Sequence, residues 1–514
     1  MIRRPALVDV VTALGLVTAA LALRLRYWGG YGLSDDSIFL GEVRQILVGG
    51  TVAPDNQAYR FTWWLPTAVF CRLFGMTEVS MVLPYLIYSL VGIALVYGFG
   101  RRLFGRFGGL AAGLMVVVHP TDVRWATLIA NDFAFSVFAL LTFRAALAAT
   151  DEPHLPRRAW LWAASALCLW LCYHSKVTAP VLAVGLAGLF LSRRDRLAGL
   201  GWFFTTALVL FGASALVSYV FAGTIFGPLQ AELKFQGVLH APPPGPGTVR
   251  DALLLWPRML FSTDYLGNYY HAFFPHALVV LWLASWPLGL RSAPVLWWWL
   301  LPLFVGMELS FVRVDGYWVT GFRNFRHAHV FVYPIVLLVA GYLAALRRRT
   351  RHVAAVILAV LVVTGLREAA KTAEVTHTAF DDGRAVCNFL AGQPGGMVYV
   401  DPYLWGRCTE TYGAQVGRWW TNTLPPDPPT RARLLAQAEP GAYAVTGGAR
   451  EPVYTGPVWV PRAAELPPER FLSVLDRGGP VNEAWRPEPL RIWRAEAWPG
   501  QSYCLVSDDG VCRQ

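Results

Sequence analysis

Two adjacent carboxylates, Asp35 and Asp36, follow the first apolar segment of the chain. Carboxyl groups this close, near a low-dielectric boundary, tend to titrate at different pH values, which suits one of them to act as a general base. The same pair could instead hold a divalent cation, which is the one cofactor that the sequence leaves open. The structural alternative is a solvated turn in which Asp36 caps the helix that follows.

A second set of candidates begins with His119 and ends with Asp132. Asp132 stands at the start of an otherwise apolar segment, where an unpaired charge is costly, so it is a candidate for function. Alternatively, its negative charge is simply favoured by the helix dipole at an N-terminal end. Asp122 could equally be a surface loop residue, and Arg124 beside it is a candidate for binding a negatively charged substrate.

The segment from His174 to Lys176 interrupts two apolar runs. Lysine is rare here, since only Lys176, Lys234 and Lys371 occur among 44 basic residues. A scarce cation at this place is a candidate for binding the phosphate of a lipid, with His174 beside it. The alternative is a side chain that extends to the lipid headgroups without further function.

A basic cluster precedes one of the last apolar segments. Planar guanidinium groups bind phosphate through two parallel hydrogen bonds, so these residues are candidates for phosphate recognition. Contact with anionic headgroups is the alternative. The cluster consists of Arg313, Arg323, Arg326, His327 and His329, and weaker candidates of the same kind are Arg258 and His271.

The composition requires a membrane to surround these residues. Hydrophobic residues make up 55% of 514 and charged residues only 15%, whereas soluble domains carry about 25% charged residues. The net charge of +11 comes from arginines in short loops between apolar runs. This pattern indicates topology rather than a nucleic-acid partner.

About eleven apolar segments predict a membrane all-α multispan bundle. We expect helices near residues 6–23, 79–99, 109–118, 126–147, 160–173, 177–191, 203–221, 273–288, 295–309, 330–346 and 353–366. Between them, the long outer loops would cover about 24–77, 222–272 and 310–329. The first of these loops contains an amphipathic stretch, Ile38 to Leu47.

Orientation follows from the arginines, which favour the cytoplasmic side. With a cytoplasmic N-terminus, every alternate loop is basic, and the first segment is a retained helix rather than a cleaved signal peptide. The odd number of spans predicts a transmembrane domain, 1–366, and an extracytoplasmic domain, 367–514. An arginine-rich, lysine-poor composition suggests a bacterium with a GC-rich genome, and hence the bacterial inner membrane.

The C-terminal region has a different pattern, with short alternating or β-branched runs and proline-rich turns that predict a small α/β domain. We expect strands at Met397 to Val400, Tyr443 to Thr446 and Val458 to Val460, and a helix at Thr430 to Ala438.

Cysteines divide between the two regions. Four lie in the C-terminal region, where an oxidising compartment would allow two disulfides, with Cys504 and Cys512 the favoured local pair. Those four are Cys387, Cys408, Cys504 and Cys512; the other three, Cys71, Cys168 and Cys172, lie in or near apolar segments, and we expect inert core residues there rather than a metal site.

Five motifs together carry a family resemblance. They are Leu33-Ser-Asp-Asp-Ser, the segment Tyr85 to Gly105 ending in Phe-Gly-Arg-Arg-Leu-Phe-Gly, His119-Pro with Asn131-Asp132-Phe, Tyr173-His-Ser-Lys176, and Arg323-Asn-Phe-Arg326-His. In this order, over residues 3–366, the chain resembles polyprenyl-phosphate-sugar-dependent glycosyltransferases of the GT-C superfamily, such as protein O-mannosyltransferases and aminoarabinose transferases.

The resemblance implies transfer of a sugar from a polyprenyl-phosphate donor, with inversion, to a hydroxyl on a lipid, glycan or protein. It implies that Asp35 is the catalytic carboxylate, with Asp36 where such enzymes often have glutamate, and that Asp132 is the second acidic position. Lys176 and the outer arginines would contact the donor phosphate. Two other hypotheses are a transporter or flippase of lipid-linked sugars, which would need charges near the bilayer midplane, and a noncatalytic membrane scaffold.

Overall fold

The computed structural model describes most of the chain. The described residues are 7–30, 36–50, 59–130, 132–192, 198–231, 281–286, 293–308, 311–314, 317–320, 329–400, 408, 419–422, 435, 438–446, 471–476, 491–495, 505–506 and 512–513. The chain divides into two compact units, one of Met1–Gly32 and Ile38–His377, the other of Leu33–Ser37 and Thr378–Gln514. The predicted domain boundary after residue 366 lies within a single helix, α16.

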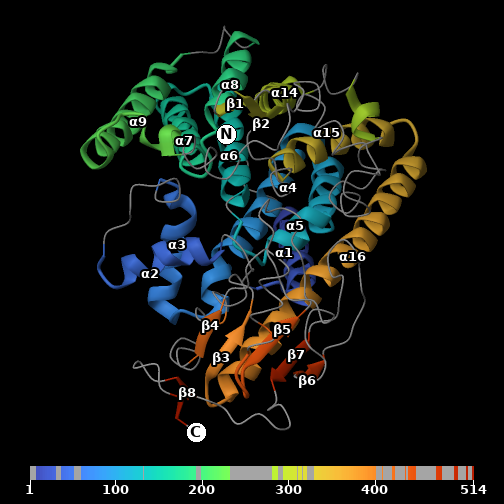
Figure 1. Ribbon diagram of the computed structural model, residues 1–514. Coiled ribbons are helices and arrows are strands. Elements are labelled where there is room, and N and C mark those ends of the chain that lie inside the picture. The colour runs from blue at the N-terminus through green and yellow to red at the C-terminus, as the bar shows by residue number, and fades with distance from the viewer. Residues whose placement is uncertain are drawn as a thin grey trace. The chain divides into compact units, whose positions relative to one another are not determined.

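Helices dominate the first unit (Figure 1). They are α1 (Leu7–Arg26), α2 (Asp36–Leu47), α3 (Phe61–Phe74), α4 (Glu78–Val117), α5 (Pro120–Trp125), α6 (Asp132–Asp151), α7 (Leu155–Tyr173), α8 (Pro180–Ser192), α9 (Gly201–Ala222), α14 (Pro294–Glu308), α15 (His329–Arg347) and α16 (Arg351–Gly392), the last of which ends in the second unit. A short antiparallel hairpin, β1 (Phe311–Val314) with β2 (Tyr317–Thr320), lies between α14 and α15.

Helix α4 contains both the second and third predicted segments, because it folds back on itself. The turn lies at Gly105, whose φ of 80° is favourable only for glycine. After the turn the backbone returns so closely that a Cβ on Gly109 would lie 2.7 Å from the carbonyl oxygen of Tyr97. A capping box between Thr77 and Ser80 fixes where the helix begins.

Helices α4, α6 and α15 pack side by side in the first unit (Figure 1). The contact of α4 with α15 is close, since a Cβ on Gly92 would lie 2.0 Å from the Tyr333 hydroxyl. Helices α8 and α14 are similarly close at Gly185, where a Cβ would lie 2.0 Å from the Trp298 carbonyl oxygen. Small residues thus allow the helix backbones to approach each other.

Ion pairs join one end of these helices, here called the basic end. Asp9 of α1 pairs with Arg101 at 2.7 Å and with Arg106 at 3.2 Å, on either side of the α4 turn. Arg102 pairs with Asp151, the last residue of α6, at 2.8 Å. Helix α15 has 19 residues and ends at this basic end with Arg347. Its length from His329 to Arg347 is about 27 Å, close to the hydrocarbon thickness of a bilayer.

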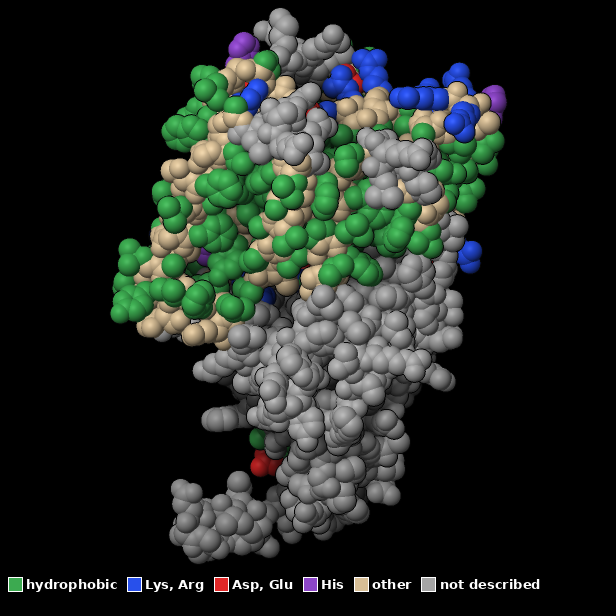
Figure 2. All heavy atoms as spheres, turned by 90° about the horizontal axis from the view of Figure 1, so that it is seen from above, with side chains coloured by type: hydrophobic (Ala, Val, Ile, Leu, Met, Phe, Trp, Pro, Cys, Tyr) green, Lys and Arg blue, Asp and Glu red, His purple; other side chains and the backbone are tan. Residues whose placement is uncertain are grey.

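The outer surface of the first unit is strongly apolar. Six helices in the described part of the chain are long and apolar enough to cross a membrane: α1, α4, α6, α9, α15 and the start of α16. On α9, Leu208 is 75% exposed and Val220 is 68% exposed. Figure 2 shows hydrophobic side chains spread over the whole described part of this face, with most Lys and Arg gathered along one edge. Such a surface requires lipid around it.

Helices α2 and α3 lie in the first predicted outer loop. The amphipathic stretch predicted there is α2, which buries Leu40 and Val43 against Trp63 of α3 and Tyr85 of α4. Helix α3 was not predicted, because its 14 residues are too few to span a membrane.

A five-stranded mixed sheet forms the centre of the second unit. Its order is β4 (Trp419–Asn422), β3 (Gly396–Tyr399), β5 (Tyr443–Thr446), β7 (Arg491–Ala495) and β6 (Phe471–Asp476), with β3 parallel to β4 and β5, and β7 antiparallel to β5 and β6. Two strands of two residues, β8 (Leu505–Val506) and β9 (Cys512–Arg513), pair separately.

Both faces of this sheet are buried, because successive side chains along each strand point to opposite faces. Val398 and Val445 pack on one face against Val386 and Leu390, from the last turns of α16. On the opposite face, Ala444 belongs to a separate buried cluster. The predicted strand at residues 458–460 lies outside the described residues.

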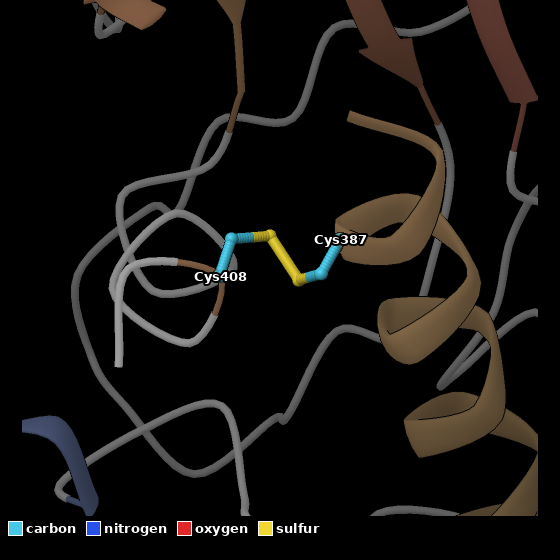
Figure 3. The surroundings of a disulfide bond; sticks show 2 residues. All are labelled: Cys387 and Cys408. Carbon is cyan, nitrogen blue, oxygen red and sulfur yellow. A yellow bond between two sulfur atoms is a disulfide. The ribbon is translucent and has the colours of Figure 1, made fainter. Parts of the chain in front are cut away.

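A disulfide joins Cys387 of α16 to Cys408 (Figure 3). It closes a sequence separation of 21 residues, and both cysteines belong to the core beside the sheet. The other predicted pair includes Cys504, which lies outside the described residues. Among the free cysteines, Cys71 and Cys172 are buried.

Candidate functional site

Lys176 and Asp132, two of the residues singled out by the sequence, form an ion pair. The Lys176 ammonium donates to Asp132 Oδ1 at 2.7 Å, and their side chains are 11% and 2% exposed. Asp132 is the first residue of α6, where its charge also faces the positive end of the helix dipole. A buried charge is tolerated only with such partners.

Hydrogen bonds from α3 hold the turn that carries Lys176. The Thr62 hydroxyl bonds the His174 carbonyl oxygen at 2.9 Å and the Ser175 hydroxyl at 2.8 Å. The Lys176 main-chain N–H donates to the Cys172 carbonyl oxygen at 2.8 Å. The position of Lys176 is therefore fixed by the ends of α3 and α7.

His174, a predicted substrate-binding residue, joins neighbouring elements through both ring nitrogens. Nδ1 lies 2.8 Å from the Tyr59 carbonyl oxygen, which can only accept, so Nδ1 carries the proton. Nε2 then accepts from the Ser214 hydroxyl at 3.0 Å, and Ser214 accepts from the Trp170 indole at 2.8 Å. Burial lowers the pKa of His174, which favours this neutral form.

A second network surrounds Asp122. Its carboxylate accepts hydrogen bonds from Arg24 of α1, from Ser89 of α4 and, at 3.0 Å, from His329 Nε2 of α15. Arg24 and Asp122 are fully buried, with side-chain exposures of 0% each. Arg24 also donates to the Val117 carbonyl oxygen at 3.1 Å. Asp122 is thus a buried part of the helix core, not a surface loop residue.

The Asp122 network reaches the start of α6. His329 Nδ1 lies 2.9 Å from the Ser136 hydroxyl, and that hydroxyl bonds the Asp132 carbonyl oxygen at 2.9 Å. His329 was grouped in the sequence with the basic phosphate-binding cluster, but its ring contacts Asp122 and Ser136. It therefore holds α5, α6 and α15 together beneath the Asp132 and Lys176 pair.

Burial and neighbouring charges set the protonation states of Asp122 on α5 and of His119, the residue before this helix. Burial opposes the charged form of Asp122, but the Arg24 guanidinium and the bonds from His329 and Ser89 outweigh it and lower the pKa from 3.8 to about 2. Burial lowers the pKa of His119 from 6.5 to about 3. Asp122 is therefore ionised and His119 neutral near pH 7.

Arg124 lies on α5, two residues after Asp122 in the sequence. Its side chain is buried, and its guanidinium carbon lies 4.9 Å from the centre of the Trp125 ring. Such stacking fixes the direction of a guanidinium group.

Several predicted site residues are beyond what the structure describes. Asp36 begins α2, but its side chain and all of Asp35 lie outside the described residues. The same holds for Arg258, Arg323, Arg326 and His327. Within the described ranges, no group of three or more His, Cys, Asp or Glu side chains could hold a metal ion.

Arg24, Ser89 and Ser136 were missed by the sequence reasoning. Arg24 had been assigned to the start of an outer loop, although it lies in the last turn of α1. An arginine at the end of an apolar run was the available signal, because a charge within a spanning helix requires a partner. The two serines gave no signal.

Comparison with known proteins places these residues in a family context. Residues 61–219 match the family model described as dolichyl-phosphate-mannose-protein mannosyltransferase. The matched range includes Asp122, Asp132 and Lys176. None of the curated protein sequences matches the chain.

The chain also aligns with several solved structures. ArnT from Cupriavidus metallidurans bound to undecaprenyl phosphate aligns over 93% of this chain and 97% of that chain, with 15% identity and a TM-score of 0.51. ArnT in the apo state aligns over 84% and 92%, with 13% identity and a TM-score of 0.50. The Archaeoglobus fulgidus oligosaccharyltransferase in complex with Zn and sulfate aligns over 78% and 61%, with 11% identity and a TM-score of 0.45.

The family match and the ArnT fold confirm the resemblance to GT-C glycosyltransferases that the motifs predicted. They also confirm a multi-pass helical membrane protein, in agreement with the six apolar helices.

Proposed function

We propose that this protein is a membrane glycosyltransferase that moves a sugar from a polyprenyl-phosphate donor to an acceptor hydroxyl on the extracytoplasmic face. The observation that carries the proposal is the buried pair of Lys176 and Asp132. It lies inside the part of the chain that matches a family of lipid-phosphate-sugar transferases. ArnT, whose fold is similar, binds undecaprenyl phosphate.

The reaction is a substitution at the anomeric carbon. The acceptor oxygen forms a bond to that carbon, while the bond from the carbon to the phosphate oxygen breaks. The proton of the acceptor hydroxyl passes to a carboxylate, for which Asp35 and Asp36 are the candidates. The electron pair of the broken bond remains on the polyprenyl phosphate, which leaves with increased negative charge.

Lys176 stabilises that leaving phosphate in this proposal. Its ammonium is already desolvated and held by the 174–176 turn, so little reorganisation is needed when a phosphate approaches. Asp132 keeps the lysine charged and directed toward the site when no donor is bound. Further cations proposed to contact the donor are Arg124, Arg258, Arg323, Arg326 and His327, and His174 fixes the turn beside them.

The proposed topology places the pair at the outer face. Asp132 and His329 begin their helices, and Lys176 follows the end of α7, all opposite to the basic end, which contains Arg101, Arg106 and Arg347 and would face the cytoplasm. About eleven spans would then place the C-terminal α/β domain, residues 367–514, outside. The Cys387–Cys408 disulfide supports this side, because disulfides persist in oxidising compartments.

The proposed location is the bacterial inner membrane, and the acceptor is a lipid, a glycan or a protein. A divalent cation at Asp35 and Asp36 stays a candidate, to be tested by chelation, and no step depends on it. The buried carboxylates Asp9, Asp132 and Glu152 lie at or next to helix ends, whereas a transporter would need charges near the bilayer midplane.

Transfer from a radiolabelled polyprenyl-phosphate sugar, in membranes that express variants, tests the proposal. Asp35→Asn or Asp36→Asn should reduce transfer by about 10²–10⁴-fold if that residue is the base. Lys176→Ala should reduce it by about 10²–10³-fold through lost phosphate stabilisation. Matched controls are Asp151→Asn and Lys371→Ala, which remove the same charges from exposed positions.

The variants must retain the size-exclusion profile of the wild type. Equal transfer by all of them would refute the assignment of these residues to the reaction. Loss of transfer in the controls as well would show that the changes act on folding rather than on the site.

A further inference from the structure

A small pocket at the basic end is unrelated to the proposed transfer site. It has a volume of about 340 Å³ and lies between the turn of α4 and the last turn of α15. Arg106, Arg347 and Arg348 form its basic wall, and Phe104 and Phe107 form its aromatic wall. Basic and apolar groups therefore line the same pocket.

The apolar side of this pocket is closely packed. Phe104 fills the space over two glycines, since a Cβ on Gly108 would lie 2.4 Å from a Phe104 side-chain atom and one on Gly341 would lie 2.7 Å from another. The pocket thus has a fixed aromatic base where α4 meets α15.

The basic side has unbalanced charge. Asp9 forms ion pairs with both Arg101 and Arg106, and Asp151 forms one with Arg102. For Arg347 and Arg348, the described part of the chain supplies no carboxylate within ion-pair distance. The Arg347 guanidinium carbon instead lies 4.7 Å from the centre of the Phe107 ring, which directs it along the pocket.

Exposed apolar helix surface follows closely in the sequence after Arg347 and Arg348, which line this pocket. Helix α16 begins four residues after Arg347, and its Val353 and Val356 are 49% and 62% exposed. Figure 2 shows the basic edge directly bordering hydrophobic side chains. A ligand with a phosphate group and acyl chains fits both surfaces, whereas a free anion would use only the arginines.

We propose that this pocket binds the headgroup of an anionic phospholipid, with the phosphate at Arg347 and Arg348 and the acyl chains along α16. Basic pockets between helix ends bind such headgroups through charge and hydrogen bonds. The bound lipid would join α4 to α15 at the end away from Lys176. The inference needs only a membrane protein, not the proposed transfer reaction.

Thermal unfolding of the purified, delipidated protein in detergent tests the proposal, with phosphatidylglycerol titrated in. Arg348→Gln should raise the phosphatidylglycerol concentration for half-maximal stabilisation by about fivefold, as expected for one basic residue. Arg349→Gln is the matched control, because it removes the same charge from an exposed neighbour that does not line the pocket. Arg347→Gln should act as Arg348→Gln does.

Control ligands separate the proposed site from non-specific lipid binding and from free-anion binding. Phosphatidylcholine, which carries no net charge, and inorganic phosphate at the same concentration should leave the unfolding temperature unchanged. Equal responses of Arg348→Gln and Arg349→Gln would overturn the pocket, and so would equal stabilisation by phosphatidylcholine. Stabilisation by inorganic phosphate alone would assign the arginines to a free anion instead. Arg347 stacks on Phe107, so Arg347→Gln can fail to fold. In that case Arg348→Gln alone tests the proposal, because Arg348 stacks on no ring in the described structure.

Discussion

Removing the charge of Asp122 should destabilise the protein more than any surface substitution. The Asp122→Asn variant leaves the Arg24 guanidinium fully buried without its counter-charge, and both side chains are 0% exposed in the wild type. Breaking a buried ion pair on one side costs about 3–5 kcal/mol. The lowered pKa of Asp122, from 3.8 to about 2, represents about 2–3 kcal/mol of this, at about 1.4 kcal/mol per unit. The remainder is the cost of the uncompensated arginine.

Arg24→Met completes a double-mutant cycle with Asp122→Asn. Because the double variant contains neither charge, it should be less destabilised than the sum of the single variants by about 1–3 kcal/mol. Reversible unfolding of the protein in mixed detergent micelles, followed by tryptophan fluorescence, measures each free energy. A loss below about 1 kcal/mol for Asp122→Asn, or strict additivity in the cycle, would refute the buried pair.

The same pair predicts a pH dependence with a definite sign. A carboxyl whose pKa is lowered by folding contributes stability above its unfolded pKa of 3.8, and that contribution is lost as the pH falls through about 2. The difference in unfolding free energy between wild type and Asp122→Asn should therefore be constant from pH 7 to about 4 and should decrease below it. A difference that grows on acidification would contradict the assignment.

Three further predictions concern other parts of the chain. Burial lowers the pKa of His119 from 6.5 to about 3, so on acidification the unfolded state binds a proton at a higher pH than the folded state does. The free energy of unfolding should therefore fall by about 2 kcal/mol between pH 7.5 and 5. In unfolding experiments, His119→Gln should reduce this dependence on pH. Gly185→Ala should lower the unfolding temperature by several degrees, since its Cβ would meet a main-chain oxygen at 2.0 Å, whereas Gly15→Ala, with nothing within 4 Å, should not. Cys387→Ser should destabilise the C-terminal unit by about 3 kcal/mol, seen as faster proteolysis of that unit, and a rate equal to the wild type would contradict a structural role for the disulfide.

Hydropathy was sufficient to predict most of the helices. The segments expected near residues 6–23, 160–173 and 330–346 correspond to α1, α7 and α15, because apolar runs bounded by arginines leave little choice of structure in a bilayer. The break between the segments expected at 79–99 and 109–118 was also predicted, but not how short it is: one residue, Gly105, reverses the chain among Arg101, Arg102 and Arg106. Strands β6 and β7 were also missed; in β6 the register shifts between Ser473 and Leu475, which breaks the alternation of that strand.

The sequence was sufficient to single out residues of the candidate site, but not to predict which of them contact each other. Asp132 and Lys176 were each singled out, yet their pairing joins positions 44 residues apart. The bond between His329 and Asp122 joins positions 207 residues apart. Such contacts depend on helix packing, which a hydropathy pattern does not specify. Asp122 is a clear example, because the same Asp in a short turn can face water or, as here, an arginine of another helix.

The most direct test of the transferase account uses wild-type protein reconstituted in liposomes with a polyprenyl-phosphate sugar that is labelled separately in the sugar and in the prenyl chain. With extracted cell-envelope material as acceptor, the account predicts that the two labels separate, with polyprenyl phosphate released in step with sugar transfer. Movement of the doubly labelled lipid from one leaflet to the other, with the sugar-phosphate bond intact, would contradict it and favour a flippase.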